Sequence, residues 1–117
     1  ARPGETLRVR AFCQPRERAQ LNRAVLRLEA VEKVIRGSGT SKKTYRHTIH
    51  AADVELAAGR QLNAGLPFQL DHAVAVPADA PPSFHAPDNQ LLWVLSLHLD
   101  VARWPDWREE RTLTVHP

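Results

Sequence analysis

Histidine offers the first test for chemistry in this sequence, because six histidines occur among its 117 residues. His98 and Asp100 are two residues apart, so in a β-strand their side chains point to the same side and could share a metal ion. A zinc site needs three or four ligands, and the candidates for a third are His50 and His72. Because the spacing brings no third ligand to the pair, we interpret it as a surface pair and expect no metal or other cofactor.

Nucleophilic chemistry has two candidates. Cys13 is the only cysteine, which excludes an internal disulfide, and it falls on the apolar face of its strand, so we predict a buried, inert thiol. Ser83 lacks the Gly-x-Ser-x-Gly elbow that presents a catalytic serine. Residues 37–43 resemble a phosphate-binding loop in composition but not in spacing, and we interpret them as a hairpin tip. We therefore predict that the protein is not an enzyme; the alternative is a metal-dependent hydrolytic enzyme that uses His98 and Asp100.

The elements that position these residues follow from an alternation of apolar and polar side chains with a period of two. The clearest case is residues 91–101, whose apolar face consists of Leu91, Trp93, Leu95, Leu97, Leu99 and Val101. A helix of this length would scatter those side chains around its circumference. The segment is therefore predicted to be a central strand.

Shorter stretches with the same alternation are Leu7–Cys13, Leu26–Ala30, Tyr45–Ala51, Phe68–Val76 and Leu113–Val115. The apolar phase shifts between Ala30 and Val31, which is typical of a β-bulge. Glycine- and proline-rich segments at 36–41, 58–60, 63–65, 77–82, 86–89 and 104–107 predict turns between the strands. About seven strands without a convincing amphipathic helix predict an all-β, immunoglobulin-like antiparallel sandwich.

Two segments leave room for another interpretation. Residues 16–30 space Leu21, Val25 and Leu28 like a helical stripe, although we favour a polar loop followed by a strand. Residues 51–59 could form one helical turn or a short strand. The run at Glu109 and Glu110 is interpreted as solvated charge before the last strand.

Short motifs along most of the chain resemble the arrestin-like β-sandwich superfamily, including its bacterial sporulation-control members. The matching segments are Gly4-Glu5 with Leu7-Arg-Val-Arg10, Leu26–Ala30, Leu56–Gly59, Pro67–Leu70, Val76–Phe84 and Leu92–Trp107. The resemblance implies a single sandwich of this type, whereas arrestins proper pair two. The phosphate-sensing residues of visual arrestins have no counterparts in this sequence, so no ligand-binding role carries over.

Charge is unevenly divided along the chain, whose net charge is +3. Residues 1–50 hold twelve basic and four acidic side chains (+8), and residues 51–117 hold four basic and nine acidic ones (−5). We expect the two halves to neutralise each other within one fold. Nucleic acid is the less favoured partner, because the basic half offers only Phe12 and Tyr45 for stacking. The alternative is an anionic-surface binder, of nucleic acid or lipid, through the basic half.

Two groups of side chains are candidates for protein interaction. Trp104 and Trp107 flank a Trp-Pro-Asp-Trp turn, where they either cap the core, which we favour, or form a binding hot spot. The second group is basic and is expected on edge strands: Arg8, Arg10, Lys42, Lys43 and Arg46. Such residues discourage accidental strand pairing, and the same edge could accept a partner's extended peptide.

These observations predict a single domain over residues 1–117 that acts as a non-catalytic protein-interaction or scaffold module. No apolar run is long enough to span a membrane and methionine is absent, so we expect a domain of a longer bacterial protein, cytoplasmic or tethered to a membrane through segments outside this chain.

Overall fold

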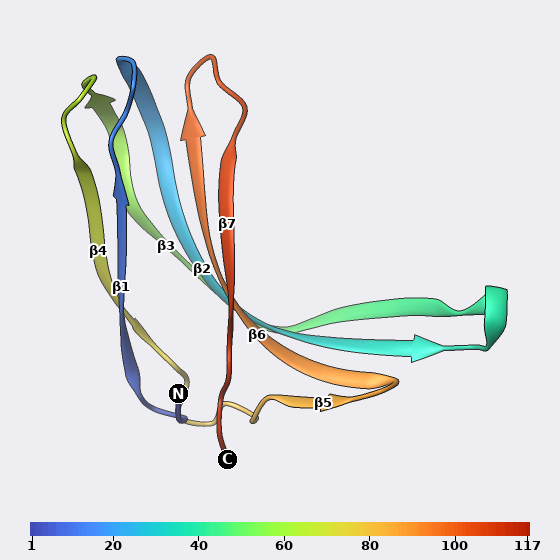
Figure 1. Ribbon diagram of the computed structural model, residues 1–117. Helices are drawn as coiled ribbons and strands as arrows, with labels where there is room; N and C mark the ends of the chain where they lie inside the picture. The colour runs from blue at the N-terminus through green and yellow to red at the C-terminus, as the bar shows by residue number, and fades with distance from the viewer.

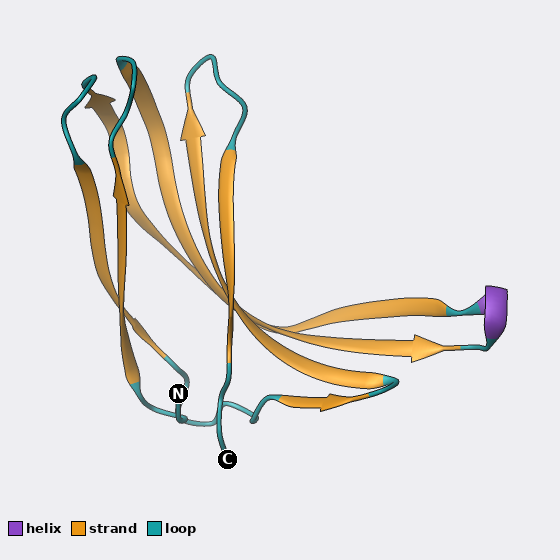
Figure 2. Cartoon of the chain, viewed as in Figure 1, coloured by secondary structure: helices purple, strands orange, loops and turns teal.

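The computed structural model describes all 117 residues, and strands make up most of the chain (Figure 2). In chain order the elements are β1 (Thr6–Cys13), β2 (Ala19–Arg36), the 3-10 turn η1 (Gly39–Ser41), β3 (Lys43–Leu62), β4 (Phe68–Ala75), β5 (Phe84–Ala86), β6 (Asn89–Val101) and β7 (Trp107–Leu113). All strand pairs are antiparallel. The predicted all-β class with about seven strands is confirmed. No helix has the length and apolar character that crossing a membrane requires.

The smaller sheet contains only β1 and β4. It begins at a turn in which the Glu5 amide donates to the carbonyl of Arg2 at 3.1 Å, and Gly4 has a φ of +80° that glycine adopts without strain. Gly4 and Glu5 together face Val76, because the Gly4 amide donates to the Val76 carbonyl and the Val76 amide donates to the Glu5 carbonyl. This glycine bulge sets the phase in which every second residue of β1 faces the core.

The larger sheet has the order β3-β2-β6, and on the far side of β6 two strands share its edge. β5 pairs with the N-terminal part of β6, and β7 pairs with its C-terminal part. The predicted central position of this strand is therefore confirmed. So is its buried face, since Leu91, Trp93, Leu95 and Leu97 are all at most 9% exposed.

The core is a cluster of 13 buried side chains between the two sheets. Its largest member, Trp93, is fully buried, and its indole Nε1–H donates to the carbonyl of Pro81 at 2.9 Å. Pro81 lies in the segment that leads from β4 in the smaller sheet to β5 in the larger one. The proline-rich segment therefore crosses between sheets, as its missing amide donors predict.

The β2–β3 hairpin extends well past the sandwich and ends at η1 (Figure 1). Pairing between β2 and β3 shifts register between Ala30 and Val31, where Ile49 on β3 is the extra residue. From this point outward, residues 31–50 are named the arm. None of them is fully buried, and Val31–Ile35 are half-buried in succession because the smaller sheet does not cover them. The predicted bulge is confirmed, and it marks where the strand leaves the sandwich.

The arm makes the molecule elongated. Its radius of gyration is 17.3 Å and its extents are 50 × 37 × 18 Å, whereas a compact domain of this length has a radius of gyration of about 13 Å. The molecule is therefore more extended than a compact domain of its length.

Several local expectations are corrected. The predicted turn at 58–60 is wrong: β3 runs through it, with Ala58 opposite Arg23, Arg60 opposite Leu21, and Gly59 at a φ of +60° within the strand. Glycine there accommodates an irregular strand instead of reversing the chain.

Residues 51–59 are accordingly neither a helical turn nor a short strand but the middle of a 20-residue strand. The helical alternative for residues 16–30 is wrong, because β2 begins at Ala19. Glu109 and Glu110 lie inside β7 and not before it.

Candidate functional site

An open apolar cleft lies between β1 of the smaller sheet and β6 and β7 of the larger sheet. It has a volume of about 410 Å³. Its apolar walls are Val9, Ala11 and Cys13 of β1, Leu95, Leu97 and Leu99 of β6, together with Leu26, Leu70, Phe12 and Trp107. Ten of the 13 lining residues are hydrophobic, so the cleft favours an apolar occupant.

The cleft exists because the smaller sheet has two strands and cannot cover the full width of the larger one. β1 pairs with β4 on one side only, so its other edge is free. The bond from the Val76 amide to the Glu5 carbonyl fixes which β1 residues turn their backbone groups toward β4. Because this direction alternates along an antiparallel strand, Arg8, Arg10 and Phe12 present their amides and carbonyls to the free edge.

The two tryptophans of the turn between β6 and β7 are not core caps. Trp104 is 54% exposed and Trp107 is 45% exposed, and neither packs in the core cluster. The capping interpretation is therefore wrong. The turn places Arg103 at a φ of +68° and projects Trp104 outward, while Trp107 is the first residue of β7 and borders the cleft.

Arg8 and Arg10 share one acidic partner on the outer face of the smaller sheet. The Arg8 guanidinium donates to both carboxylate oxygens of Asp71 at 3.0 Å, and Arg10 Nε lies 3.6 Å from the same carboxylate. The hydrogen bond from Arg8 lowers the pKa of Asp71, and the charges of both arginines act in the same direction. The same hydrogen bond raises the pKa of Arg8. Both guanidiniums remain largely exposed beside the free edge.

Cys13 lies at the end of β1 with its side chain half-buried in the cleft wall. Burial raises the pKa of its thiol, which keeps the sulfur protonated and weakens it as a nucleophile. The predicted burial is therefore only partial, and the predicted inertness of this thiol stays a prediction.

The structure separates the residues considered for metal binding. Trp93 and His50 both face the core side of the larger sheet, where their rings lie 5.7 Å apart. His98 is five residues from Trp93 on β6 and so points to the opposite face. There its Nε2 lies 3.0 Å from a carboxylate oxygen of Asp106. No three His, Cys, Asp or Glu side chains gather closely enough to hold a metal ion.

Ser83 has a structural role in this arrangement. Its hydroxyl oxygen accepts a hydrogen bond from the Val115 amide at 2.9 Å, and its own amide donates to the Val115 carbonyl at 2.9 Å. These bonds hold the C-terminal segment against the proline-rich crossing. His85 contacts Gln90 instead of the serine.

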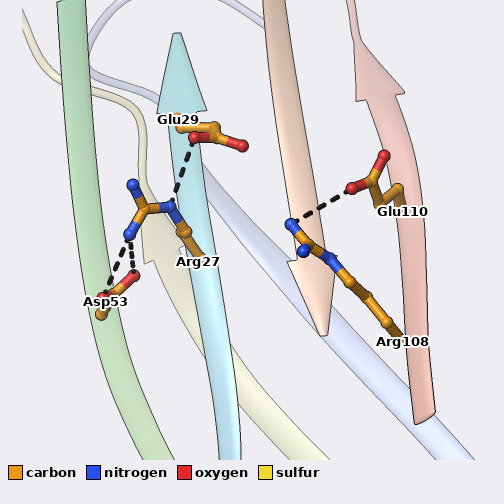
Figure 3. Close-up of polar contacts among 5 residues, drawn as sticks. All are labelled: Arg27, Glu29, Asp53, Arg108 and Glu110. Carbon is orange, nitrogen blue, oxygen red and sulfur yellow. Dashed lines mark hydrogen bonds and ion pairs between the residues drawn. The ribbon is translucent and has the colours of Figure 1, made fainter. Parts of the chain in front are cut away.

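The basic residues fall into two groups with different surroundings. In the sandwich several of them meet acids: Arg27 lies between Glu29 and Asp53, and Arg108 pairs with Glu110 (Figure 3). Further pairs join Arg23 to Glu55 and Arg111 to Glu109. The five basic interaction candidates also separate, with Arg8 and Arg10 on β1 and with Lys42, Lys43 and Arg46 in the arm on or beside β3. Both β1 and β3 are edge strands, as expected for these residues.

Sequence reasoning did not find most of the cleft. Leu97 and Leu99 were recognised as a buried face, but the place where that face lies open could not be inferred. Glu109 and Arg111 were interpreted as solvated charge, yet they line the cleft. In a strand, Glu109 and Arg111 point to one face, and Arg108 and Glu110 point to the other. This alternation in the sequence could have indicated that one of the two charged pairs faces the cleft.

The two antiparallel sheets, the central β6 and the proline-rich crossing define an arrestin-like β-sandwich. Among solved structures, the chain is similar to Spo0M, a sporulation control protein from Bacillus subtilis, with a TM-score of 0.73 and 14% sequence identity. The match covers 100% of this chain and 45% of the Spo0M chain, so this chain spans less than half of that protein's length. No protein-family model and no curated protein sequence matches. The resemblance inferred from the sequence is thus confirmed at the level of the fold.

Proposed function

We propose that this domain is a non-catalytic protein-interaction module that binds an extended segment of a partner protein along the free edge of β1. The observation that carries the proposal is the apolar cleft of about 410 Å³ beside that edge. The likeness to a protein named for a control function supports a regulatory role of this kind.

A partner strand added beside β1 would make two kinds of contact. Its backbone would pair with the outward amides and carbonyls of Arg8, Arg10 and Phe12. Every second side chain would then point into the cleft toward Leu97, Leu99 and Trp107, because side chains alternate along a strand. We therefore expect the partner segment to alternate apolar and polar residues.

The other exposed edge beside the cleft is less suited to pairing. β7 turns the charged side chains of Glu109 and Arg111 inward, and inward charges are one way in which proteins block edge strands. This contrast favours β1 as the edge that accepts the partner.

The test uses peptides selected from a library of random extended sequences on the intact domain. Arg10→Pro removes an outward amide that β4 does not use, and Arg10→Ala removes the same side chain but keeps the amide. We expect the proline variant to bind selected peptides at least about 10-fold more weakly and the alanine variant to retain most affinity. Circular dichroism and thermal unfolding establish that both variants fold.

Cys13 provides an independent readout, since it is the only thiol and lines the cleft. A bound peptide should slow its alkylation. Equal weakening by both Arg10 variants, or binding that leaves the alkylation rate unchanged, would contradict strand addition at this edge.

A further inference from the structure

The arm carries basic side chains that no acid neutralises. They are Lys33, Arg36, Lys42, Lys43 and Arg46, against the single acid Glu32, which gives residues 31–50 a net charge of +4. None of the five takes part in an ion pair, whereas six of the eleven arginines outside the arm do. Asp88 touches the arm only through its carbonyl, which accepts a bond from the Ile35 amide at 2.9 Å.

The arm also differs from the sandwich in the type of its basic residues. The chain contains three lysines, and all three lie in the arm at positions 33, 42 and 43. The ammonium group of lysine is a compact, hydrated charge on a flexible stem. Lysines that neutralise DNA phosphates release condensed counterions and so contribute to binding without reading the bases. Lysine is depleted at protein–protein interfaces, so this composition favours a phosphate polymer over a protein partner.

The charges occupy both faces of the ribbon. Arg36 lies opposite Lys43 in the β2–β3 register, so these two share one face. Lys33 lies opposite Arg46 and is three residues from Arg36, which places this second pair on the other face. A flat membrane could meet only one face at a time. A nucleic-acid groove presents phosphates on two sides, and it matches this distribution.

Tyr45, the only tyrosine in the chain, lies within this basic group. It is 53% exposed and borders a depression that Arg36, Arg46 and His47 line together with Val34 and the arm's single acid, Glu32. The basic half contains few aromatic residues, which made nucleic acid the less favoured partner. In the structure, however, the tyrosine lies among the unpaired charges. The tip, residues 37–41, contains only Gly, Ser and Thr and offers no apolar side chain for insertion into a membrane.

From these observations we infer that the arm binds duplex DNA through its phosphates, with its outer end, residues 35–44, lying in the major groove, because β2 and β3 pair there without a third strand. The major groove of B-form DNA is about 12 Å wide and admits a two-stranded β-ribbon. The contacts are electrostatic and independent of base sequence. This site is distinct from the β1 edge and does not depend on the peptide-binding proposal.

The experiment measures binding of a fluorescein-labelled DNA duplex to the intact domain by anisotropy over a salt series. With about four neutralised phosphates, affinity should fall about 100-fold between 50 and 200 mM salt. The double variant Lys42→Glu/Lys43→Glu should bind at least about 10-fold more weakly at low salt, and the slope of log K against log salt should fall by about two units. Arg2→Glu/Arg16→Glu is the matched control, because both arginines are exposed, lie outside the arm and form no ion pair.

Every outcome of this experiment either supports or overturns DNA binding by the arm. Loss of binding in the arm variant with retention in the control supports the inference. Equal loss in both variants would show a response to net charge alone and would overturn it. Tighter binding to phosphatidylserine vesicles or to poly-glutamate than to the duplex would overturn the choice of DNA, and so would the absence of duplex binding at 50 mM salt.

Discussion

Strands β2 and β3 run through both the sandwich and the arm, yet the two regions differ in burial and in charge. Within the sandwich, Leu21, Leu26 and Leu28 of β2 are at most 2% exposed. Farther along the same strand, Val34 and Ile35 are only half-buried, although pairing with β3 continues to Arg36. The pairing is the same in both regions, and the difference lies in whether a second sheet covers the strands. Coverage therefore decides where apolar side chains contribute most to stability.

The two regions also treat charge differently. Six of the eleven arginines outside the arm lie beside acids, as Arg27 does between Glu29 and Asp53. The basic residues of the arm have no such neighbours. A covered, stabilising region and an uncovered, charged region suggest separate roles for the two ends of one hairpin, and the following predictions test that division.

The largest difference should appear when a side chain is removed from each region. Trp93→Ala removes a fully buried indole and should lower the free energy of unfolding by about 3–5 kcal/mol. Tyr45→Ala in the arm should change it by about 0.5 kcal/mol or less, because the ring is 53% exposed. Urea unfolding measures both, and comparable losses would show that the arm contributes to the cooperative core.

A smaller effect is expected from two serines. Ser83→Ala leaves the Val115 amide without its side-chain acceptor in a nearly buried segment, which should cost about 1–3 kcal/mol. Ser38→Ala at the arm tip removes a hydroxyl that caps no backbone group and should be nearly neutral. Thermal unfolding of the two variants tests the contrast, and a stable Ser83 variant would contradict the role assigned to this bond.

The arm tip permits a comparison within one loop. Gly37 has a φ of +97°, and a Cβ there would lie 2.5 Å from the Ser41 carbonyl oxygen, so Gly37→Ala should strain the tip by about 1–3 kcal/mol. Gly39→Ala meets no atom within 4 Å and should cost less. Amide hydrogen exchange should accelerate in the arm of the first variant while the protection of β6 amides is retained. Equal acceleration in both regions would mean that the arm and the sandwich unfold together.

The smallest effect concerns the exposed pair of Arg8 and Asp71. Because the folded-state pKa of Asp71 is lowered, its contribution to stability is present above the unfolded pKa of about 4 and is lost as pH falls through the folded value. Asp71→Asn should therefore lower stability slightly at pH 7 and by less at about pH 2, where more of the carboxylate is protonated. Glu32→Gln in the arm, where the carboxylate forms no ion pair, is the matched substitution. Urea unfolding at both pH values tests this, and a loss that is undiminished in acid would contradict the ion-pair explanation.

Local patterns predicted much of the fold and little of the candidate site. The alternation in residues 91–101 predicted both a strand and its buried face, because side-chain direction in a strand depends only on neighbouring residues. The turn at Gly59 was predicted wrongly, because glycine's conformational freedom suits a turn and a strand irregularity equally well. The position of the tryptophan turn was predicted correctly. Its sequence could not show that the core is complete without the two tryptophans.

The sequence by itself determined which segments are strands, which side of each strand is apolar and which connection crosses between sheets. Only the tertiary structure decided that β1 and β7, at opposite ends of the chain, border one cleft, that Asp71 neutralises two arginines far from it in sequence, and that the basic arm extends beyond the second sheet. The physical reason is that strand alternation is a property of adjacent residues. In contrast, the covering of one sheet by another, the position of free strand edges and the pairing of charges depend on contacts between strands that are distant in the sequence.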